Sequence, residues 1–226
     1  MRSYVEASAR HANAARIAPL LERIIPDVTL HARFVNTLAR MEYVGVRKIL
    51  KSRRSECLDL DGLQHILDEA VHALRLKKAA TALAGRQPLQ VLTFADSHTL
   101  AGDAGEGYLQ ALDHRAEVTL ADLPEGERAE ANYLLTSAAI EVRAQVFYPI
   151  YDECLRLHGV GFSVASISKD EDRHLEEMAS GLQTLPEWRP RLELVLATEE
   201  TLYGRFLAAV EAALPASRTH GAVPLA

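Results

Sequence analysis

The sequence predicts an all-α fold: a four-helix bundle with a long middle crossover and an extra helix at each end. Most of the 226 residues carry apolar positions at helical spacing, whereas the alternating patterns of β-strands are scarce. The long helical patterns form two hairpins, at about 29–84 and 125–183. Roughly forty residues join the hairpins, which is enough for the chain to cross from one end of a bundle to the other.

The first three helices are expected at about 4–24, 29–53 and 59–84. Pro26 ends the first of them, because proline cannot continue the hydrogen-bond ladder of a helix. Asp27 or Thr29 is expected to cap the second helix, since a short polar side chain accepts hydrogen bonds from the free amides of a first turn. Asp59 or Asp61 occupies the same place before the third helix.

The later helices are expected at about 125–157, 164–183 and 187–214. Pro124 opens the long helix, because proline suits a first turn and acidic residues follow it. Gly159 ends this helix, and Pro186 separates the last two. Within the middle connection, residues 91–94 are expected to be extended and residues 108–114 to form a short helix.

The composition fits one globular domain covering residues 1–226, with its four-helix core at about 29–183. The net charge of −6 offers no basic surface for nucleic acid. Cys57 and Cys154 lie far apart and form neither a disulfide framework nor a paired-cysteine metal motif, so a reducing, cytoplasmic setting is expected. No signal peptide and no apolar run of about 18 residues is present, so no membrane partner is expected.

One short sequence, Asp-Glu-x-x-His, occurs twice, at 68–72 and at 170–174. Both copies lie in predicted helices. The helix before each copy carries a glutamate on its apolar stripe, Glu42 in the first hairpin and Glu141 in the second. A buried glutamate loses several kcal/mol of hydration free energy unless it is paired or bound to a metal. Two such glutamates, one in each hairpin, favour a shared explanation.

Two metal ions inside the bundle would explain this arrangement. A glutamate and a histidine three residues apart share a helix face, so both can bind one ion. Carboxylate and imidazole ligands suit iron or manganese, whereas thiolate sites need cysteines that the motif lacks. The predicted metal ligands are Glu42, Glu69, His72, Glu141, Glu171 and His174. The competing interpretation is that these are unrelated charges on helix surfaces.

Further residues near the motif are candidates for other roles. Asp68 and Asp170 are each expected to accept a hydrogen bond from the second ring nitrogen of a metal-bound histidine, in the same hairpin or in the other one. His65, one helical turn before the first motif glutamate, is either an extra ligand or an ordinary histidine. Tyr148, two turns beyond Glu141, lines a substrate pocket, carries an electron or simply fills the bundle core.

The second hairpin presents a geometric difficulty, because Glu141 lies farther than Glu171 from the predicted turn at 159–161. Glu153 would match the height of Glu171 better. However, the twelve residues between Glu141 and Glu153 rotate Glu153 about 120° off the apolar stripe. We therefore expect Glu141 to be the ligand, with a bulge, an early helix end or a longer loop absorbing the offset.

In their order along the chain, Glu42, the first Glu-x-x-His, Glu141 and the second Glu-x-x-His resemble the ligand pattern of the ferritin-like di-iron carboxylate superfamily. The resemblance covers about 29–183 and implies a ferritin-like bundle that holds two irons, each with one histidine. Members include bacterioferritins, rubrerythrins and bacterial di-iron oxygenases. The chain lacks the cysteine pairs of rubrerythrins. The arylamine N-oxygenases look similar but use a further histidine four residues before the last Glu-x-x-His. This chain has Ile167 at that position, which counts against that subclass.

The resemblance implies a bacterial di-iron oxidase or oxygenase that oxidises a small organic molecule with dioxygen or peroxide and takes electrons from a donor. Two iron ions are the expected cofactor, and manganese or a mixed pair would fit the same ligands. The alternative is a ferroxidase or rubrerythrin-like protein that oxidises iron or removes peroxide without an organic substrate. A third possibility is a helical module without metal. A homodimer is also expected, through apolar faces of the first and last helices.

Overall fold

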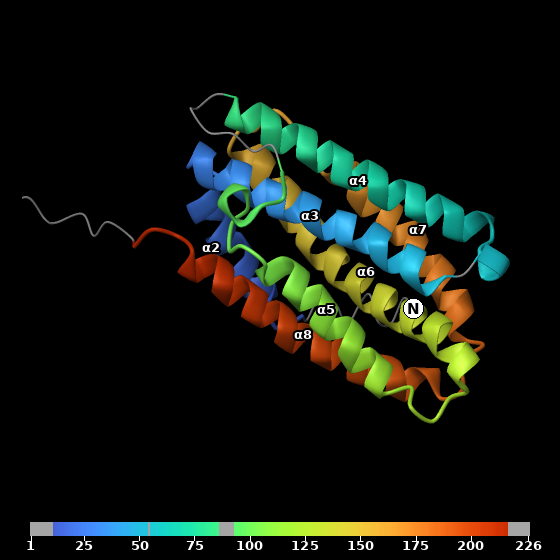
Figure 1. The fold of residues 1–226 in the computed structure, drawn as a ribbon. Coiled ribbons are helices and arrows are strands. Elements are labelled where there is room, and N and C mark those ends of the chain that lie inside the picture. Colours follow the sequence, from blue (N-terminus) through green and yellow to red (C-terminus); the bar gives the residue numbers. More distant parts are fainter. Residues whose placement is uncertain (1–10, 54, 86–92, 217–226) are drawn as a thin grey trace, which may run out of the picture.

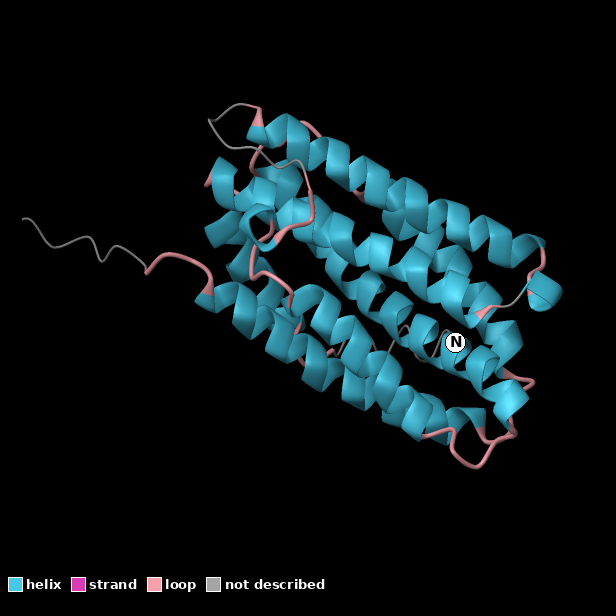
Figure 2. Ribbon diagram, in the orientation of Figure 1, coloured by secondary structure: helices cyan, strands magenta, loops and turns pink. Residues whose placement is uncertain are grey.

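The computed structural model describes residues 11–53, 55–85 and 93–216, which form helices and connecting loops without a β-strand. Its α-helices are α2 (Ala14–Ile24), α3 (Val28–Ser52), α4 (Leu60–Ala84), α5 (Ala104–Val118), α6 (Glu125–Leu157), α7 (Ala165–Leu182) and α8 (Trp188–Ala212). Two short 3-10 turns, η1 (Ser55–Cys57) and η2 (Asp96–His98), lie in the connections. Figures 1 and 2 show the long helices aligned along one direction. The all-α prediction is confirmed for the described residues.

Capping residues explain where the helices of the first hairpin begin. Asp27 Oδ1 accepts hydrogen bonds from the backbone amides of Thr29 and Leu30, at 2.9 and 3.1 Å. Asp59 Oδ1 accepts one from the amide of Gly62, at 2.9 Å. Each aspartate satisfies amides that have no partner within their own helix. Of the caps that the sequence offers, Asp27 and Asp59 are therefore the ones used.

The helices pack as two hairpins with a covering layer. α3 packs along α4, and α6 packs along α7. α5 and α8 lie side by side against α3 and α6, and α2 packs on α6 (Figure 1). α5 also carries the chain from the end of the molecule where α4 stops to the end where α6 begins. The long middle connection thus crosses the molecule lengthwise.

The middle connection differs from its prediction in two ways. The helix expected at 108–114 extends over Ala104–Val118, because more of its residues pack against the fold than the pattern indicated. The buried residues of this helix are Gly105, Tyr108, Leu112 and Ala116. The segment expected to be extended at 91–94 is a bend where it is described, and Phe94 stacks on the ring of Tyr43. The first two residues of that segment lie outside the described ranges.

The other helices lie close to where the sequence places them. α3, α4, α6, α7 and α8 begin and end within a few residues of the expected bounds. Of the helix expected at 4–24, residues 14–24 form α2, and residues 4–10 lie outside the described ranges. Among the helices that are described, none is long and apolar enough to span a membrane.

Two clusters of buried apolar residues lie towards opposite ends of the bundle. One joins α2 to the first half of α3 and the second half of α6, and it includes Phe34, Leu76 and Tyr151. The other joins the first half of α6 to α5, α7 and α8, and it includes Leu135 and Leu182. Each helix of the two hairpins carries a glutamate between these clusters, namely Glu42, Glu69, Glu141 or Glu171. The fold therefore places four acids at the middle of the bundle.

Candidate metal centre

Seven titratable side chains from four helices meet between the two apolar clusters. They form a first group of His65, Glu69, Glu141 and His174, and a second group of Glu42, Glu69, His72 and Glu171. In each group the ligand atoms lie within 4.8 Å of one another, so that each could hold a metal ion. His72 and His174 are completely buried, and Glu42 has only 12% of its side chain accessible. The structure brings all six predicted ligands together and adds His65.

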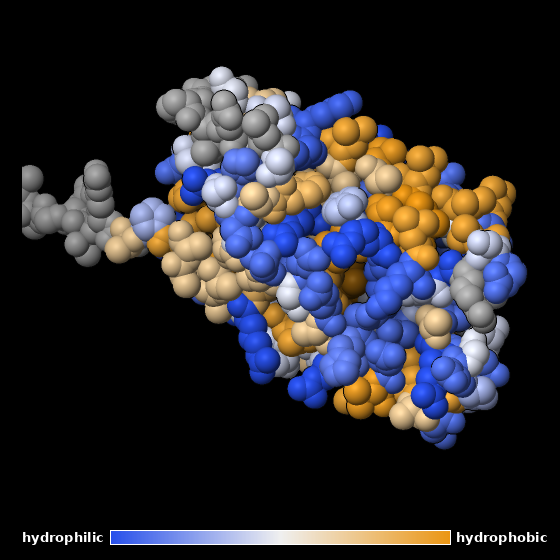
Figure 3. Space-filling model, in the orientation of Figure 1, coloured by the Kyte–Doolittle hydropathy of each residue, from blue (hydrophilic) through white to orange (hydrophobic). Residues whose placement is uncertain are grey.

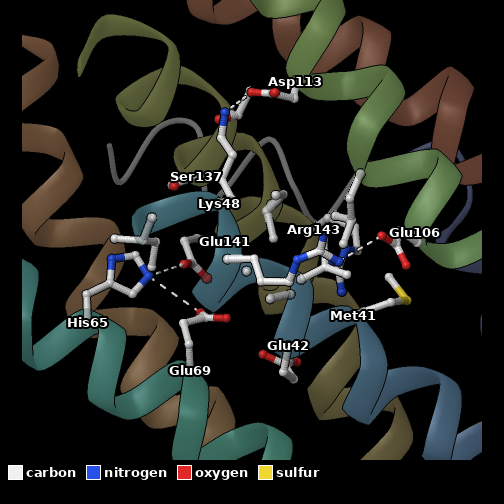
Figure 4. Close-up of a pocket in the computed structure, with 18 of the residues that line it drawn as sticks. Met41, Glu42, Lys48, His65, Glu69, Glu106, Asp113, Ser137, Glu141 and Arg143 are labelled. Atoms are coloured by element: carbon white, nitrogen blue, oxygen red, sulfur yellow. Dashed lines mark hydrogen bonds and ion pairs between the residues drawn. The ribbon is translucent and has the colours of Figure 1, made fainter. Parts of the chain in front are cut away.

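In the first group, two imidazoles face two carboxylates. Glu141 Oε1 is 3.6 Å from His65 Nε2 and 3.7 Å from His174 Nδ1. Glu69 Oε1 is 3.5 Å from the same nitrogen of His65. The rings of His65 and His174 stack, with their centroids 4.1 Å apart. Figure 4 shows the side chains of His65, Glu69 and Glu141 turned towards one another.

In the second group, one imidazole nitrogen faces two carboxylates. His72 Nδ1 is 3.3 Å from Glu171 Oε1 and 3.9 Å from Glu42 Oε2. The other oxygen of Glu171, Oε2, is 2.8 Å from Nδ1 of His174 in the first group. Because Glu69 belongs to both groups and Glu171 contacts both, the two groups are neighbours within a single cluster.

The outer nitrogen of each motif histidine is held by the aspartate of the other motif copy. His72 Nε2 lies 3.0 Å from Asp170 Oδ2, and His174 Nε2 lies 3.3 Å from Asp68 Oδ2. Both contacts run between α4 and α7. The resulting tautomer would leave Nδ1 of each ring, the atom that faces the carboxylates, without a proton and free to bind a cation.

His65 is held in the same manner by a tyrosine. Its Nδ1 lies 2.8 Å from the hydroxyl of Tyr133 on α6, and its Nε2 faces the cluster. The apolar stripe and the motif spacing do not single out Tyr133 in the sequence. The available signal was its position two turns before Glu141 on the same face of α6.

Two local features fit a bound cation. Nδ1 of His72 is buried and makes no hydrogen bond within the described part of the chain, although carboxylate oxygens lie beyond it. On α3, a Cβ atom added to Gly45 would lie 2.3 Å from Oε2 of Glu69. Glycine at this position therefore leaves room for the glutamate that both groups share. A glycine inside a helix costs about 1 kcal/mol relative to alanine, and this was the signal by which the sequence could have revealed Gly45.

Without a cation, the cluster balances its charges by holding protons. Burial alone lowers the pKa of an imidazole, but Glu171 and Glu42 outweigh it and raise the pKa of His72 to about 10. Burial also acts to lower the pKa of His174, but Glu141 and Glu171 outweigh burial and raise this pKa to about 11. Burial, together with the nearby carboxylates, raises the pKa of Glu42 well above its usual value. The cluster thus has an excess of negative charge that protons or metal ions must offset.

The loop between α6 and α7 resolves the height of Glu141. Asp152 Oδ1 accepts a hydrogen bond from the amide of Val164 at 2.8 Å, so the chain folds back along α6 before α7 begins. Gln145 Nε2 then donates to the carbonyl of Ser168 at 3.2 Å. Glu141 lies one turn from Gln145, and Glu171 lies about one turn from Ser168 in the same direction, so both acids reach the same level. A longer loop therefore absorbs the offset.

Glu153, the other acid considered at this height, lies outside the cluster. Its exposed carboxylate accepts a hydrogen bond from Nε of Arg156, at 2.8 Å. Tyr148, in contrast, is buried beside the cluster, and its hydroxyl donates a hydrogen bond to Glu42 Oε1. Tyr148 is therefore placed to hold one carboxylate of the second group.

A cavity of about 490 Å³ opens beside the cluster, between α3, α5 and α6. The inner wall contains His65, Glu42, Glu69, Glu141 and Glu171. The remaining wall includes the apolar residues Met41, Val44, Leu109, Ile140 and Ala144. Its basic residues are Arg47, Lys48, Lys51 and Arg143. Figure 3 shows a hollow on this face, ringed by hydrophilic side chains. A small molecule in the cavity would reach the carboxylates directly.

Comparison of the chain with protein-family profiles, curated protein sequences and solved structures finds no match. The structure therefore defines the class of protein by itself: an all-helical protein with a buried cluster of carboxylates and histidines that could hold a metal ion. Any narrower assignment rests on the chemistry of this cluster and of the cavity beside it.

Proposed function

We propose that the protein is a di-iron carboxylate oxidoreductase with a ferritin-like four-helix core, which activates dioxygen or peroxide at a two-metal site to oxidise a small organic molecule. One observation carries the proposal: two buried ligand groups share Glu69 and draw on all four helices of the two hairpins. Four carboxylates buried together have a large desolvation cost, and two divalent cations would offset their charge.

The donor atoms favour iron or manganese. Every candidate donor is a carboxylate oxygen or an imidazole nitrogen, and no cysteine belongs to either group. A bound pair of iron ions would supply the redox chemistry with dioxygen or peroxide. Electrons from a donor protein or small molecule would complete the reaction, in a cytoplasmic setting.

The protein's own residues would orient the ligands and control access. Asp68 and Asp170 hold the outer nitrogens of the motif histidines, which turns both Nδ1 atoms inwards. Tyr148 donates to Glu42 and fixes that carboxylate. The apolar clusters on either side keep bulk water from the ligands, so that a substrate approaches through the cavity.

The cavity favours an organic substrate over the alternative of a ferroxidase or peroxide-scavenging protein. An iron-oxidising protein needs an acidic route that leads iron to the cluster. Here the acids on the outer part of the cavity wall are Glu106, which pairs with Arg47 at 3.0 Å, and Asp113, which pairs with Lys48. The rest of the described outer wall is apolar, basic or polar without charge, which suits an organic molecule better than a metal ion.

Anaerobic metal loading tests the proposal. Metal-free protein is mixed with Fe²⁺, desalted and analysed for iron, and it is then exposed to oxygen while near-ultraviolet absorption is followed. We expect two irons per chain and an absorption band of oxidised iron. Glu69→Ala and His174→Ala should each lose iron and the band. Glu153→Ala, which removes an exposed glutamate of α6, should keep both.

Two results would contradict the proposal. Protein that takes up neither iron nor manganese would exclude a metal centre and favour a helical module without metal. Protein that continues to oxidise iron far beyond two ions per chain would favour the ferroxidase.

A further inference from the structure

Arg143 is a buried cation on the wall of the cavity. It follows Glu141 by two residues on α6, so its side chain lies on the face of the helix turned towards α5 and α8. Only 7% of the residue is exposed, and its guanidinium carbon lies 5.4 Å from the centre of the Tyr203 ring. Arg143 also lines the cavity beside the cluster (Figure 4).

The charge of Arg143 has no acid of its own. Among the described residues, none places a carboxylate within ion-pair distance of its guanidinium, and its Nε makes no hydrogen bond. Glu199 is the acid that acts on it from a distance, but the oxygens of Glu199 already bond to the Tyr108 hydroxyl at 2.7 Å and to His11 Nε2 at 3.0 Å. A guanidinium whose buried Nε has no partner in the described part of the chain can still donate a hydrogen bond to an anion that enters the cavity.

Arg143 differs in this respect from Arg47 and Lys48, which also line the cavity, whereas Lys51, the remaining basic residue of the wall, is exposed to solvent. Arg47 is bound to Glu106, and Lys48 is bound to Asp113. Both therefore have a carboxylate before any ligand arrives. A guanidinium presents a planar set of donors that matches a carboxylate, so Arg143 is the cation of this cavity best suited to recognise one.

The rest of the outer wall is suited to hydrocarbon. Its apolar side chains include Met41, Val44, Leu109, Ile140 and Ala144. The volume of about 490 Å³ falls within the range of pockets that enclose small organic ligands. A molecule that uses both features has one carboxylate and an apolar body.

We propose that the cavity binds a medium-sized organic carboxylate, whose carboxylate group contacts Arg143 and whose apolar body lies along Met41, Val44, Leu109 and Ile140. This inference names the substrate class of the oxidoreductase proposed above and rests on that function. In this arrangement the carboxylate of the substrate contacts Arg143, away from the acidic cluster, and the hydrocarbon part of the substrate faces that cluster.

Calorimetric titration of metal-free protein tests the inference, because it detects binding without any reaction. Octanoate is the probe, and 1-octanol and octylammonium, with the same hydrocarbon chain, are its matched neutral and cationic controls. We expect one octanoate per chain, bound at least tenfold more tightly than either control. Arg143→Gln should remove this preference, Arg143→Lys should keep part of it, and Arg205→Gln, on the exposed side of α8, should leave it unchanged.

The outcomes separate this inference from the proposed function. Equal affinity for octanoate and octanol would overturn the inference, even in protein that binds two irons. Octanoate binding that Arg143→Gln does not weaken would overturn it as well. Octanoate binding that depends on Arg143 in a protein unable to take up metal would support the carboxylate site and contradict the oxidoreductase. If Arg143→Gln does not fold, as judged by circular dichroism, the comparison of the three probes on the native chain decides.

Discussion

The position of the Glu69 carboxylate depends on the glycine at position 45. This carboxylate belongs to both ligand groups and lies where the Cβ of any other residue at position 45 would be. Gly45 lies in the middle of α3, where glycine weakens a helix. The site therefore requires at this position the residue that the helix itself disfavours.

Replacement of Gly45 should separate metal binding from stability. Gly45→Ala should lower metal affinity about tenfold or more, which is the effect of changing a group that orients a metal ligand. The variant should still fold. Gly107→Ala is the matched control, because a Cβ there meets nothing within 4 Å. It should raise stability by about 0.5–1 kcal/mol and leave metal affinity unchanged. Metal titration and urea unfolding measure the two effects, and unaltered affinity in Gly45→Ala would contradict the role of Gly45.

His31 makes stability depend on pH, at a distance from the cluster. Its ring is 1% exposed, stacks on Phe162 and lies 2.8 Å from the hydroxyl of Tyr151. Burial, aided by the nearby His158, lowers the pKa of His31 to about 4. Between the ordinary pKa of histidine, 6.5, and about 4, the unfolded imidazole is protonated and the folded one is not. Stability is therefore lost as the pH falls through this window.

The full separation of the two pKa values corresponds to about 3 kcal/mol. Urea unfolding at pH 7, 6, 5 and 4 should show that His31→Gln, which cannot titrate, loses less stability than the native chain by up to this amount. His114→Gln, a change at an exposed histidine of α5, should follow the native curve. Parallel curves for the native chain and His31→Gln would show that His31 does not contribute.

At the scale of elements, α4 uses both of its faces. Its inner face carries His65, Glu69 and His72. Its outer face carries four leucines that are each more than half exposed, Leu60, Leu63, Leu67 and Leu74. Figure 3 shows the hydrophobic patch on this side of the molecule. A solvent-exposed apolar stripe at helical spacing usually marks an interface.

We expect a second copy of the chain to cover this stripe. Two antiparallel copies of α4 would place identical leucine stripes against each other, because a two-fold interface uses the same surface on both chains. The homodimer expected from the sequence would thus form through α4. The apolar faces of α2 and α8, from which it was expected, are buried within the chain itself.

Sedimentation velocity tests this dimer. Leu67→Glu should convert it to monomer, whereas Leu194→Glu, at an exposed leucine of α8, should not. A native chain that is monomeric at micromolar concentration would show that the stripe has another use.

Local chemistry explains why the helices were predictable and parts of the connections were not. Asp27 and Asp59 cap α3 and α4 through bonds to residues a few positions away, so the sequence alone indicates them. The loop between α6 and α7 folds back because Asp152 reaches Val164, a contact that the sequence pattern does not reveal. The sequence alone therefore leaves the height of Glu141 open, and the fold of this loop determines it.

The same reasoning applies to the candidate site. The six predicted ligands lie on apolar stripes, and a stripe is visible in sequence because it repeats. Arg143 lies off the stripe of Glu141, two residues farther along α6, and it lines a cavity that α3 and α5 form together with α6. Its environment is created by tertiary structure, so no local pattern predicts it.

At the scale of the whole molecule, the proposed metal ions would act as part of the core. The four carboxylates come from four helices, and their repulsion opposes the packing of the two hairpins. Divalent ions bound only by the folded chain would reverse that effect. The free energy of unfolding should then increase by about 2.7 kcal/mol at a metal concentration 100 times the Kd.

Thermal unfolding with Mn²⁺ and with a chelator measures this contribution. The native chain should unfold at a higher temperature with Mn²⁺, and removal of the metal should return it to the lower value. Glu69→Gln should lose most of the difference, whereas Glu125→Gln, at an exposed position in the first turn of α6, should retain it. A native chain whose Tm is the same with and without Mn²⁺ would mean that the cluster does not bind this ion.

The position of Glu69 in both ligand groups has a consequence for how the site fills. An ion in one group fixes the carboxylate that the other group needs, so the second ion meets a ligand that is already ordered. Binding should then be cooperative. A sample given one ion per chain would sort largely into empty and fully loaded molecules, and each molecule would switch as a unit between an inert and a competent form.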